Sequence, residues 1–452
     1  MRARLIAVLV ALLGVAGFVQ WSGLTGIRTP AERAAIAIMR EPLPELGERN
    51  AFPALWLSPF DIPEALFETQ VAEDVARWRA LLDVDPIERR RLRVRFASSA
   101  AGRYEALPIV YGWPMLCFSW EPDCLERVRA DPEATRRALG KVRAYLGRLD
   151  RLAQYDHQTN PFQRYGATGS PQFATLFAAL LSDAALRQVE GDTGASDRLC
   201  AVAAQLRKLR LRSDDLGFST SVQSLLTGAG RLYADARAEG AADAPLPESC
   251  ARAFAPLAEA EFELCPAWRR LYQAEHETPD TTVLEDPGGP SPTERIGWAT
   301  YDYRADDPHW ARLLAASYCS SDRAARAQAR ARLSYDTKLL GCNAGERLFR
   351  PAICALREIG VSRFDDYHDL LLDLDARLTL MALAETLARL PAPEREAAFA
   401  RRQRLPIEQT HPFAFGQGEL TTPLLISRFE QGARVPLPGS RARDAQVDGG
   451  RR

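Results

Sequence analysis

The chain has 452 residues, which is enough for two or three packed units. Hydrophobic residues make up 46% of it and charged residues 26%, a globular composition that excludes a disordered chain. The formal net charge of −1 argues against a general binder of nucleic acid or of anionic membranes, because both need a basic surplus.

The N-terminal segment MRARLIAVLVALLGVAGFVQW predicts export. Arg2 and Arg4 precede an apolar run that reaches Leu24. Roughly 17–25 apolar residues cross a bilayer as a helix, so residues 1–24 are long enough for a transmembrane anchor. The preceding arginines keep the N-terminus in the cytoplasm and direct the rest of the chain outward. We therefore expect a single-pass inner-membrane protein with most of its chain in the periplasm.

Two alternatives to the anchor stay open. Small residues at Gly14 and Ala16 have the spacing of a signal-peptide cleavage site, and a cleaved signal also exports the chain. A buried soluble helix is the second alternative, and we favour it least because a core helix needs no arginines immediately before it.

Helical periodicity dominates the chain after the anchor. Asp61 and Glu64 have the spacing of a capping box for a helix over 61–82. Asp131 followed by Pro132 predicts the start of another helix. The expected helices, including two helix–turn–helix pairs, cover 61–82, 131–153, 171–186, 196–210 with 216–239, and 322–340 with 365–390.

These elements predict a mainly α fold of antiparallel helical hairpins, in an irregular bundle or an α-solenoid. Near the C-terminus, alternating apolar residues around Gly416 and Gly418 predict a small β-hairpin. The expected regions are an anchor or signal (1–24), a helical region (25–278), a Pro/Gly-rich linker (279–297), a second helical region (298–405), the hairpin (406–438) and a disordered tail (439–452).

The eight cysteines allow disulfides in an exported chain. Cys117 and Cys124 flank a short loop-like insert, so we expect them to be bridged. Cys342 with Cys354 is a second expected pair, and Cys250 with Cys265 is a weaker one. No two cysteines have the C-x2-C spacing of a zinc site, so disulfides or buried thiols are favoured over metal.

Motifs that carry chemistry are absent from the sequence, including phosphate-binding loops, nucleophile elbows and H-E-x-x-H. The glycines of TGAG at 227–230 fall within a helical stripe, where close helix packing explains them. We assign no catalytic, cofactor-binding or metal residues and expect no cofactor.

His368 lies in an acidic stretch, FDDYHDLLLDLD. Asp366, Asp369 and Asp373 share one helix face and could hold a hard cation. The neighbouring stripe of leucines instead indicates that this face is solvated, so we expect replacements there to cost less than about 0.5 kcal/mol each.

The other histidines have simple structural interpretations. His276 has acidic neighbours in sequence, but consecutive helical residues point in different directions and make no metal triad. His157, His309 and His411 lie at loop junctions, where turn and capping roles are usual. Segments rich in Trp and Tyr, such as VYGWPMLCFSW at 110–120, could bind a peptide, a glycan or a helix, although filling gaps between helices is favoured.

Four features together resemble a group of single-anchor, mostly helical envelope proteins of Gram-negative bacteria. They are the N-terminal anchor, NAFPALWLSPFDIPEA at 50–65, FAPLAEAEFEL at 254–264 after the helical hairpin, and HPFAFGQGELTTP at 411–423. The resemblance covers most of the chain. It implies location and architecture, and it implies no settled activity and no site residues.

The sequence therefore predicts a membrane-anchored periplasmic scaffold or binding protein, and it favours a role other than catalysis. Its expected partners are the inner membrane, through the N-terminal helix, and a protein of the cell envelope, with no nucleic acid. The alternative is an envelope enzyme, hydrolase-like, whose scattered catalytic residues form no motif. Roles tied to lipid or to pili also stay open.

Topology is directly testable. Alkaline phosphatase fused after Leu24 should be active, and a fusion lacking residues 1–24 should be inactive, because the enzyme needs export to fold. Release of the mature protein by carbonate, with a new N-terminus near Gly17, would instead establish a cleaved signal peptide.

Overall fold

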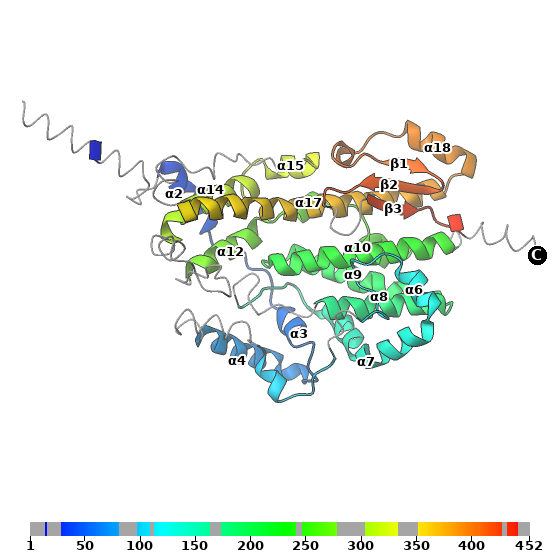
Figure 1. Ribbon diagram of the computed structural model, residues 1–452, viewed down its shortest axis with the longest axis horizontal. Coiled ribbons are helices and arrows are strands. Elements are labelled where there is room, and N and C mark those ends of the chain that lie inside the picture. The colour runs from blue at the N-terminus through cyan, green and yellow to red at the C-terminus, as the bar shows by residue number, and fades with distance from the viewer. Residues whose placement is uncertain are drawn as a thin grey trace, which may run out of the picture.

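The computed structural model describes residues 14–15, 29–80, 97–108, 113–162, 173–240, 246–277, 303–332, 351–426 and 432–441. Figure 1 shows the arrangement of the elements. The α-helices are α2 (Pro30–Met39), α3 (Phe52–Trp56), α4 (Phe67–Ala80), α6 (Cys124–Ala130), α7 (Pro132–Asp150), α8 (Phe173–Val189), α9 (Ala195–Leu211), α10 (Leu216–Glu239), α11 (Glu248–Ala253), α12 (Cys265–Glu277), α14 (Tyr303–Tyr318), α15 (Arg323–Ala329), α17 (Pro351–Ala388) and α18 (Ala392–Arg401). The strands are β1 (Ala414–Gly416), β2 (Glu419–Pro423) and β3 (Gly432–Pro436).

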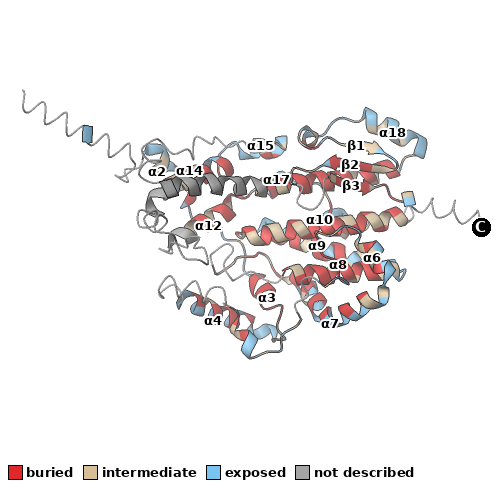
Figure 2. Cartoon of the chain, viewed as in Figure 1, coloured by how far each residue is buried: buried red, intermediate tan, exposed pale blue. Residues whose placement is uncertain are grey.

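The prediction of a mainly α fold with a small C-terminal β-hairpin is confirmed. In Figure 1, α17 runs across the molecule next to α10, with α9, α8 and α7 following on one side and the sheet on the other. Buried residues concentrate on α8, α10 and the described part of α17, as Figure 2 shows. One large core therefore joins helices from both ends of the chain.

The central helices form where the sequence predicts them. Asp131 caps α7 by accepting a hydrogen bond from the Ala134 backbone N–H at 2.9 Å, and Pro132 occupies the first turn. The predicted hairpin of 196–210 with 216–239 is present as α9 and α10. Asp215 caps α10 through the N–H groups of Gly217 and Phe218.

Three predicted helix ends are wrong. Asp61 makes no capping box with Glu64, because residues 64–66 form a 3-10 turn and the α-helix begins only at Phe67. The helix expected over 322–340 ends at Ala329, since Arg330 adopts a left-handed backbone with φ 51° and residues beyond 332 lie outside the described part. The helix expected to begin at Asp365 begins at Pro351 instead.

The C-terminal sheet has three antiparallel strands in the order β1-β2-β3. Gln417 and Gly418, both with positive φ, form the tight turn between β1 and β2, as the glycine pattern indicates. Leu420 pairs with Val435 in the register, and both side chains are buried against the helical core. The sheet thus covers one side of α10 and α17.

The TGAG stretch serves close helix packing, as the sequence suggests. A Cβ on Gly228 would lie 2.7 Å from the Ser119 Cα, which is backbone and cannot move aside cheaply. A Cβ on Gly230 would lie 3.0 Å from the Met381 sulfur of α17. The two glycines therefore set the distance of α10 from its neighbours on two sides.

Three disulfides join the described cysteines. The expected Cys117–Cys124 bridge is present. The weaker expectation of Cys250 with Cys265 is wrong, because these residues bond to Cys200 and to Cys319, respectively. Residue 342 lies outside the described residues and nothing is described of the residue 354 side chain, so that pair stays a prediction.

Helices from both sides of the predicted linker are cross-connected. α2 packs on α14, and the Cys265–Cys319 bridge joins α12 to the end of α14. The linker itself, 279–297, and the tail beyond 441 lie outside the described residues, as does the predicted anchor apart from Gly14 and Val15. In the described part of the chain, no helix has both the length and the apolarity to cross a bilayer.

A buried ion pair attaches the 254–264 segment to α9. The Arg207 Nε donates to the Glu261 Oε1 at 2.7 Å, and both side chains are less than 10% exposed. The same guanidinium donates to the backbone carbonyls of Ala253, Ala255 and Pro256. A second arginine, Arg210, donates to the Glu261 carbonyl at 3.0 Å. Every donor direction of Arg207 is therefore used to hold one irregular segment in place.

We predict that Glu261→Gln lowers the free energy of unfolding by about 3–5 kcal/mol, because it leaves two guanidinium groups buried without a counter-charge. Burial raises the pKa of Glu261, but the hydrogen bond and charge of Arg207 outweigh it and hold the pKa below the usual 4.5. A lowered folded-state pKa stabilises the protein above pH 4.5, and this contribution is lost as the pH falls through the folded-state value.

Urea unfolding of both proteins at pH 7 and below pH 4.5 measures the effect. The difference between the wild type and Glu261→Gln should shrink at the lower pH. A difference that is small at pH 7, or that grows on acidification, would contradict the assignment.

Candidate functional site

A groove between α10 and α17 is a concave feature of the described residues. The two helices run in the same direction, since Gly230 lies against Met381 and Arg237 pairs with Glu385 further along both. Two cavities of about 250 Å³ each lie along this contact. We call them the polar cavity, beside residues 220–231 of α10, and the apolar cavity, beside residues 233–237.

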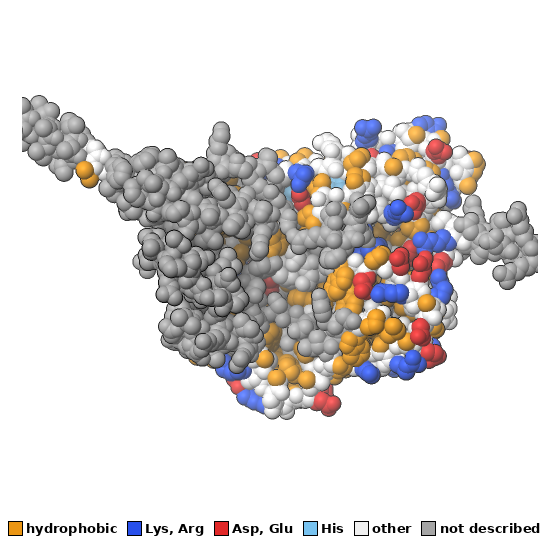
Figure 3. All heavy atoms as spheres, viewed as in Figure 1, with side chains coloured by type: hydrophobic (Ala, Val, Ile, Leu, Met, Phe, Trp, Pro, Cys, Tyr) orange, Lys and Arg blue, Asp and Glu red, His pale blue; other side chains and the backbone are white. Residues whose placement is uncertain are grey.

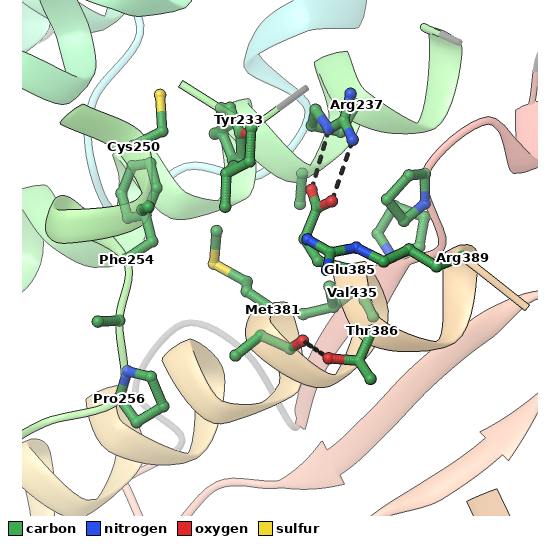
Figure 4. A pocket seen from close by; sticks show the side chains of 18 residues that line it. Tyr233, Arg237, Cys250, Phe254, Pro256, Met381, Glu385, Thr386, Arg389 and Val435 are labelled. Atoms are coloured by element: carbon green, nitrogen blue, oxygen red, sulfur yellow. Dashed lines mark hydrogen bonds and ion pairs between the residues drawn. The ribbon is translucent and has the colours of Figure 1, made fainter. Parts of the chain in front are cut away.

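Side chains from four parts of the chain line the apolar cavity. Figure 4 shows Tyr233, Phe254, Pro256, Met381 and Val435 around the hollow, with Arg237, Glu385 and Arg389 at one end of it. The 254–264 segment contributes the wall on one side, and β3 contributes the wall on the other. The cavity is therefore apolar along its length and charged at its rim.

The polar cavity has a different chemistry. Hydroxyl, amide and guanidinium groups line it together with one partly exposed tryptophan, Trp120. Gln223 is 4% exposed, and its Oε1 atom has no hydrogen-bond partner among the described residues. The other polar lining residues are Ser119, Thr220, Ser224, Thr227, Arg231, Asp373 and Arg377.

A narrow void of about 10 Å³ lies between the two cavities. It shares Thr227, Arg231 and Arg377 with the polar cavity, and Ala234, Met381 and Val435 with the apolar one. The three hollows therefore lie in a row along the contact of the two helices, and we call this row the α10–α17 groove.

Asp373 fixes residues 424–426, which form one wall of the polar cavity. Its Oδ1 atom accepts from the Leu425 backbone N–H at 2.8 Å, and its Oδ2 atom accepts from that of Ile426 at 3.0 Å. The His411 Nε2 atom lies 2.8 Å from the same Oδ1 atom, and the His411 ring is fully buried. On its other side, the ring nitrogen of His411 lies 2.9 Å from the Thr410 hydroxyl. This carboxylate is thus occupied by structural hydrogen bonds.

The expectation of a solvated acidic face on this helix is wrong. Asp369, Asp373 and Asp375 are each less than 10% exposed, and so is His368. The reason is that the chain after α15 and the chain after α18 both cross this face and supply partners. Asp369 pairs with Arg332, and Asp375 accepts from the Arg330 Nε and the Leu257 N–H, each at 2.7 Å.

His368 is buried, and among the described residues its hydrogen-bond partner is a backbone carbonyl. Its Nε2 atom lies 3.0 Å from the Ala331 carbonyl, and burial lowers the pKa of the imidazole. The side chain of residue 366 is not described. The cluster that the sequence offered as a possible cation site is therefore divided among separate ion pairs, and no three His, Cys, Asp or Glu side chains of the described part are grouped to hold a metal ion.

The remaining singled-out residues lie apart from the groove. His157 is buried beside Gly47, and burial lowers its pKa. Trp56, in the 50–65 segment, is a core residue that donates to Asp74 at 2.9 Å, so it fills a gap between helices. Trp120 of VYGWPMLCFSW is the exception, because it lies at the polar cavity. His309 lies in α14, and the side chain of residue 276 is not described.

Comparison with known proteins finds no relative of this chain. No protein-family model, no curated protein and no solved structure matches this chain.

Sequence patterns missed the groove residues Arg237, Glu385 and Arg389. Arg237 and Glu385 are 148 positions apart, so no local spacing could have paired them. A signal was present only in TGAG, since small residues within a helix mark the place where another element approaches closely.

We predict that Asp373→Asn destabilises the protein by about 2–4 kcal/mol, because the amide cannot accept from all of its present donors and the charge is lost. Thermal unfolding measures the loss, and hydrogen exchange should show faster exchange at Leu425 and Ile426. Glu394→Gln, on the exposed start of α18, is the matched control and should change stability by no more than about 0.5 kcal/mol. Equal losses of stability in the two variants would contradict the burial of Asp373 and support a solvated face.

Proposed function

We propose that this protein is a membrane-anchored periplasmic binding protein with a helical scaffold, and that it binds its ligand or partner in the α10–α17 groove. The observation that carries the proposal is the pair of cavities of about 250 Å³ each, one apolar and one polar, that lie next to each other along one helix contact. Binding sites are usually concave and mostly apolar, with a few polar groups that orient the ligand.

Two features support the periplasmic location. The three disulfides among the described residues suit an oxidising compartment, because cytosolic thiols are kept reduced. The N-terminal segment has the charge and apolar length of an anchor or an export signal.

On the described part of the face in Figure 3, acidic and basic side chains lie side by side, in keeping with the formal net charge of −1.

The burial and the hydrogen bonds of Asp373 and His411 favour binding over hydrolysis. The His411 Nε2 and Asp373 Oδ1 atoms lie 2.8 Å apart, which is the spacing of an acid–base couple. The imidazole is fully buried, and the carboxylate accepts from two backbone N–H groups in addition to the histidine. A working pair needs an open position next to the substrate, which this geometry does not leave.

Photo-crosslinking in growing cells tests the proposal. Benzoylphenylalanine placed at Trp120 or at Thr386, which line the polar and apolar cavities, should form covalent adducts on irradiation. The same residue placed at Arg143, on the exposed face of α7, should form none, because that helix lies away from the groove. Mass spectrometry of the purified protein detects the adducts and gives the mass of the bound molecule.

The proposal fails if adducts are absent at both groove positions while the protein is present and folded in the envelope fraction. It also fails if Arg143 gives the same adducts as the groove, since contact would then be unspecific.

A further inference from the structure

The apolar cavity has the size and wall chemistry of a small-molecule site. Its volume is about 250 Å³, and a cavity of roughly 150 Å³ holds benzene, so the space suits about ten non-hydrogen atoms. Aromatic, thioether and aliphatic groups form its walls: Tyr233, Phe254, Pro256, Met381 and Val435. A ligand that fills it must bring an apolar body of this size.

The charged end of the cavity has an unbalanced positive charge. Arg237 and Glu385 form a bidentate pair, with Nε–Oε1 at 2.9 Å and Nη2–Oε2 at 3.0 Å. Both side chains are mostly buried, and both carboxylate oxygens accept from the one guanidinium. The pair therefore has no net charge of its own.

Arg389 supplies the remaining charge. Its side chain is exposed, lines the cavity and extends toward the Glu385 end in Figure 4. It has no ion pair or hydrogen bond with any described residue. The nearby carbonyls of Ala388 and Leu390 accept from Arg395.

We infer that the apolar cavity binds a small monocarboxylate with an apolar body, the carboxylate paired with Arg389 and the body against Met381 and Phe254. A guanidinium matches a carboxylate in shape and charge. A cationic ligand would face the net positive rim, and a neutral one would leave Arg389 unused. A long acyl chain exceeds the volume. The inference rests on the proposed function, since it names a ligand class for the same groove.

Methionine-methyl NMR of the full-length protein in lipid nanodiscs tests the inference. The chain has four methionines, and Met381 lines the cavity, whereas Met39 is buried and Met115 exposed outside it. Titration with 3-phenylpropionate at neutral pH should shift the Met381 methyl signal, assigned by Met381→Leu, and leave those of Met39 and Met115 in place.

Two variants separate the charge from the cavity. Arg389→Gln should weaken binding of 3-phenylpropionate about five- to tenfold, and should change binding of the neutral analogue 3-phenylpropan-1-ol less than about twofold. Ala382→Trp places a large side chain on the cavity wall and should abolish binding of both. Arg401→Gln, on the exposed face of α18, is the matched control and should bind both as the wild type does.

Three results would overturn the inference: no shift at Met381 at millimolar 3-phenylpropionate, equal binding of the acid by Arg389→Gln and the wild type, or shifts that survive in a folded Ala382→Trp protein. Groove adducts in cells combined with any of these would reject the ligand class alone. Absence of adducts in cells would reject the proposed function, whether or not the acid binds.

Discussion

The buried pair of Arg207 and Glu261 is the interaction on which the rest of this structure depends. It fixes the 254–264 segment to α9 through one carboxylate and several backbone carbonyls. Asp375 then fixes the same segment to α17 through the Leu257 N–H. Because α9 and α17 lie on opposite sides of α10, this stretch joins two helices that do not pack directly on each other.

The groove follows from the same arrangement. Gly228 lets Ser119 approach α10 closely, and Gly230 does the same for Met381 of α17, at the level between the two cavities. Hollows therefore remain at each end of the contact, and their chemistry differs because their walls come from different segments. The polar cavity is closed by the 113–120 loop and residues 424–426, and the apolar cavity by the 254–264 segment and β3. A single close approach thus divides one interface into two environments.

Local sequence patterns predicted the features that depend on local physics. The cap at Asp131, the α9–α10 hairpin, the Gly416–Gly418 turn and the Cys117–Cys124 bridge each involve residues close in the chain, and all are present. The failures involve partners far apart. The acidic face of α17 had the pattern of a solvated surface, but Arg330, Arg332 and His411 arrive from other segments and bury it. The Cys250 and Cys265 partners likewise lie 50 and 54 positions away. Periodicity reports the polarity of a face and not the segments that cover it in the folded chain.

The order of the disulfides along the chain has a consequence for biogenesis. The described bridges join 117 to 124, 200 to 250 and 265 to 319, so each one closes before the next begins and none encloses or overlaps another. When such a chain emerges into an oxidising space N-terminus first, the first cysteine of each bridge is followed by its native partner as the next cysteine of this set. Oxidation in order of emergence then yields the native connectivity directly, without the slow thiol–disulfide exchange that interlaced bridges require.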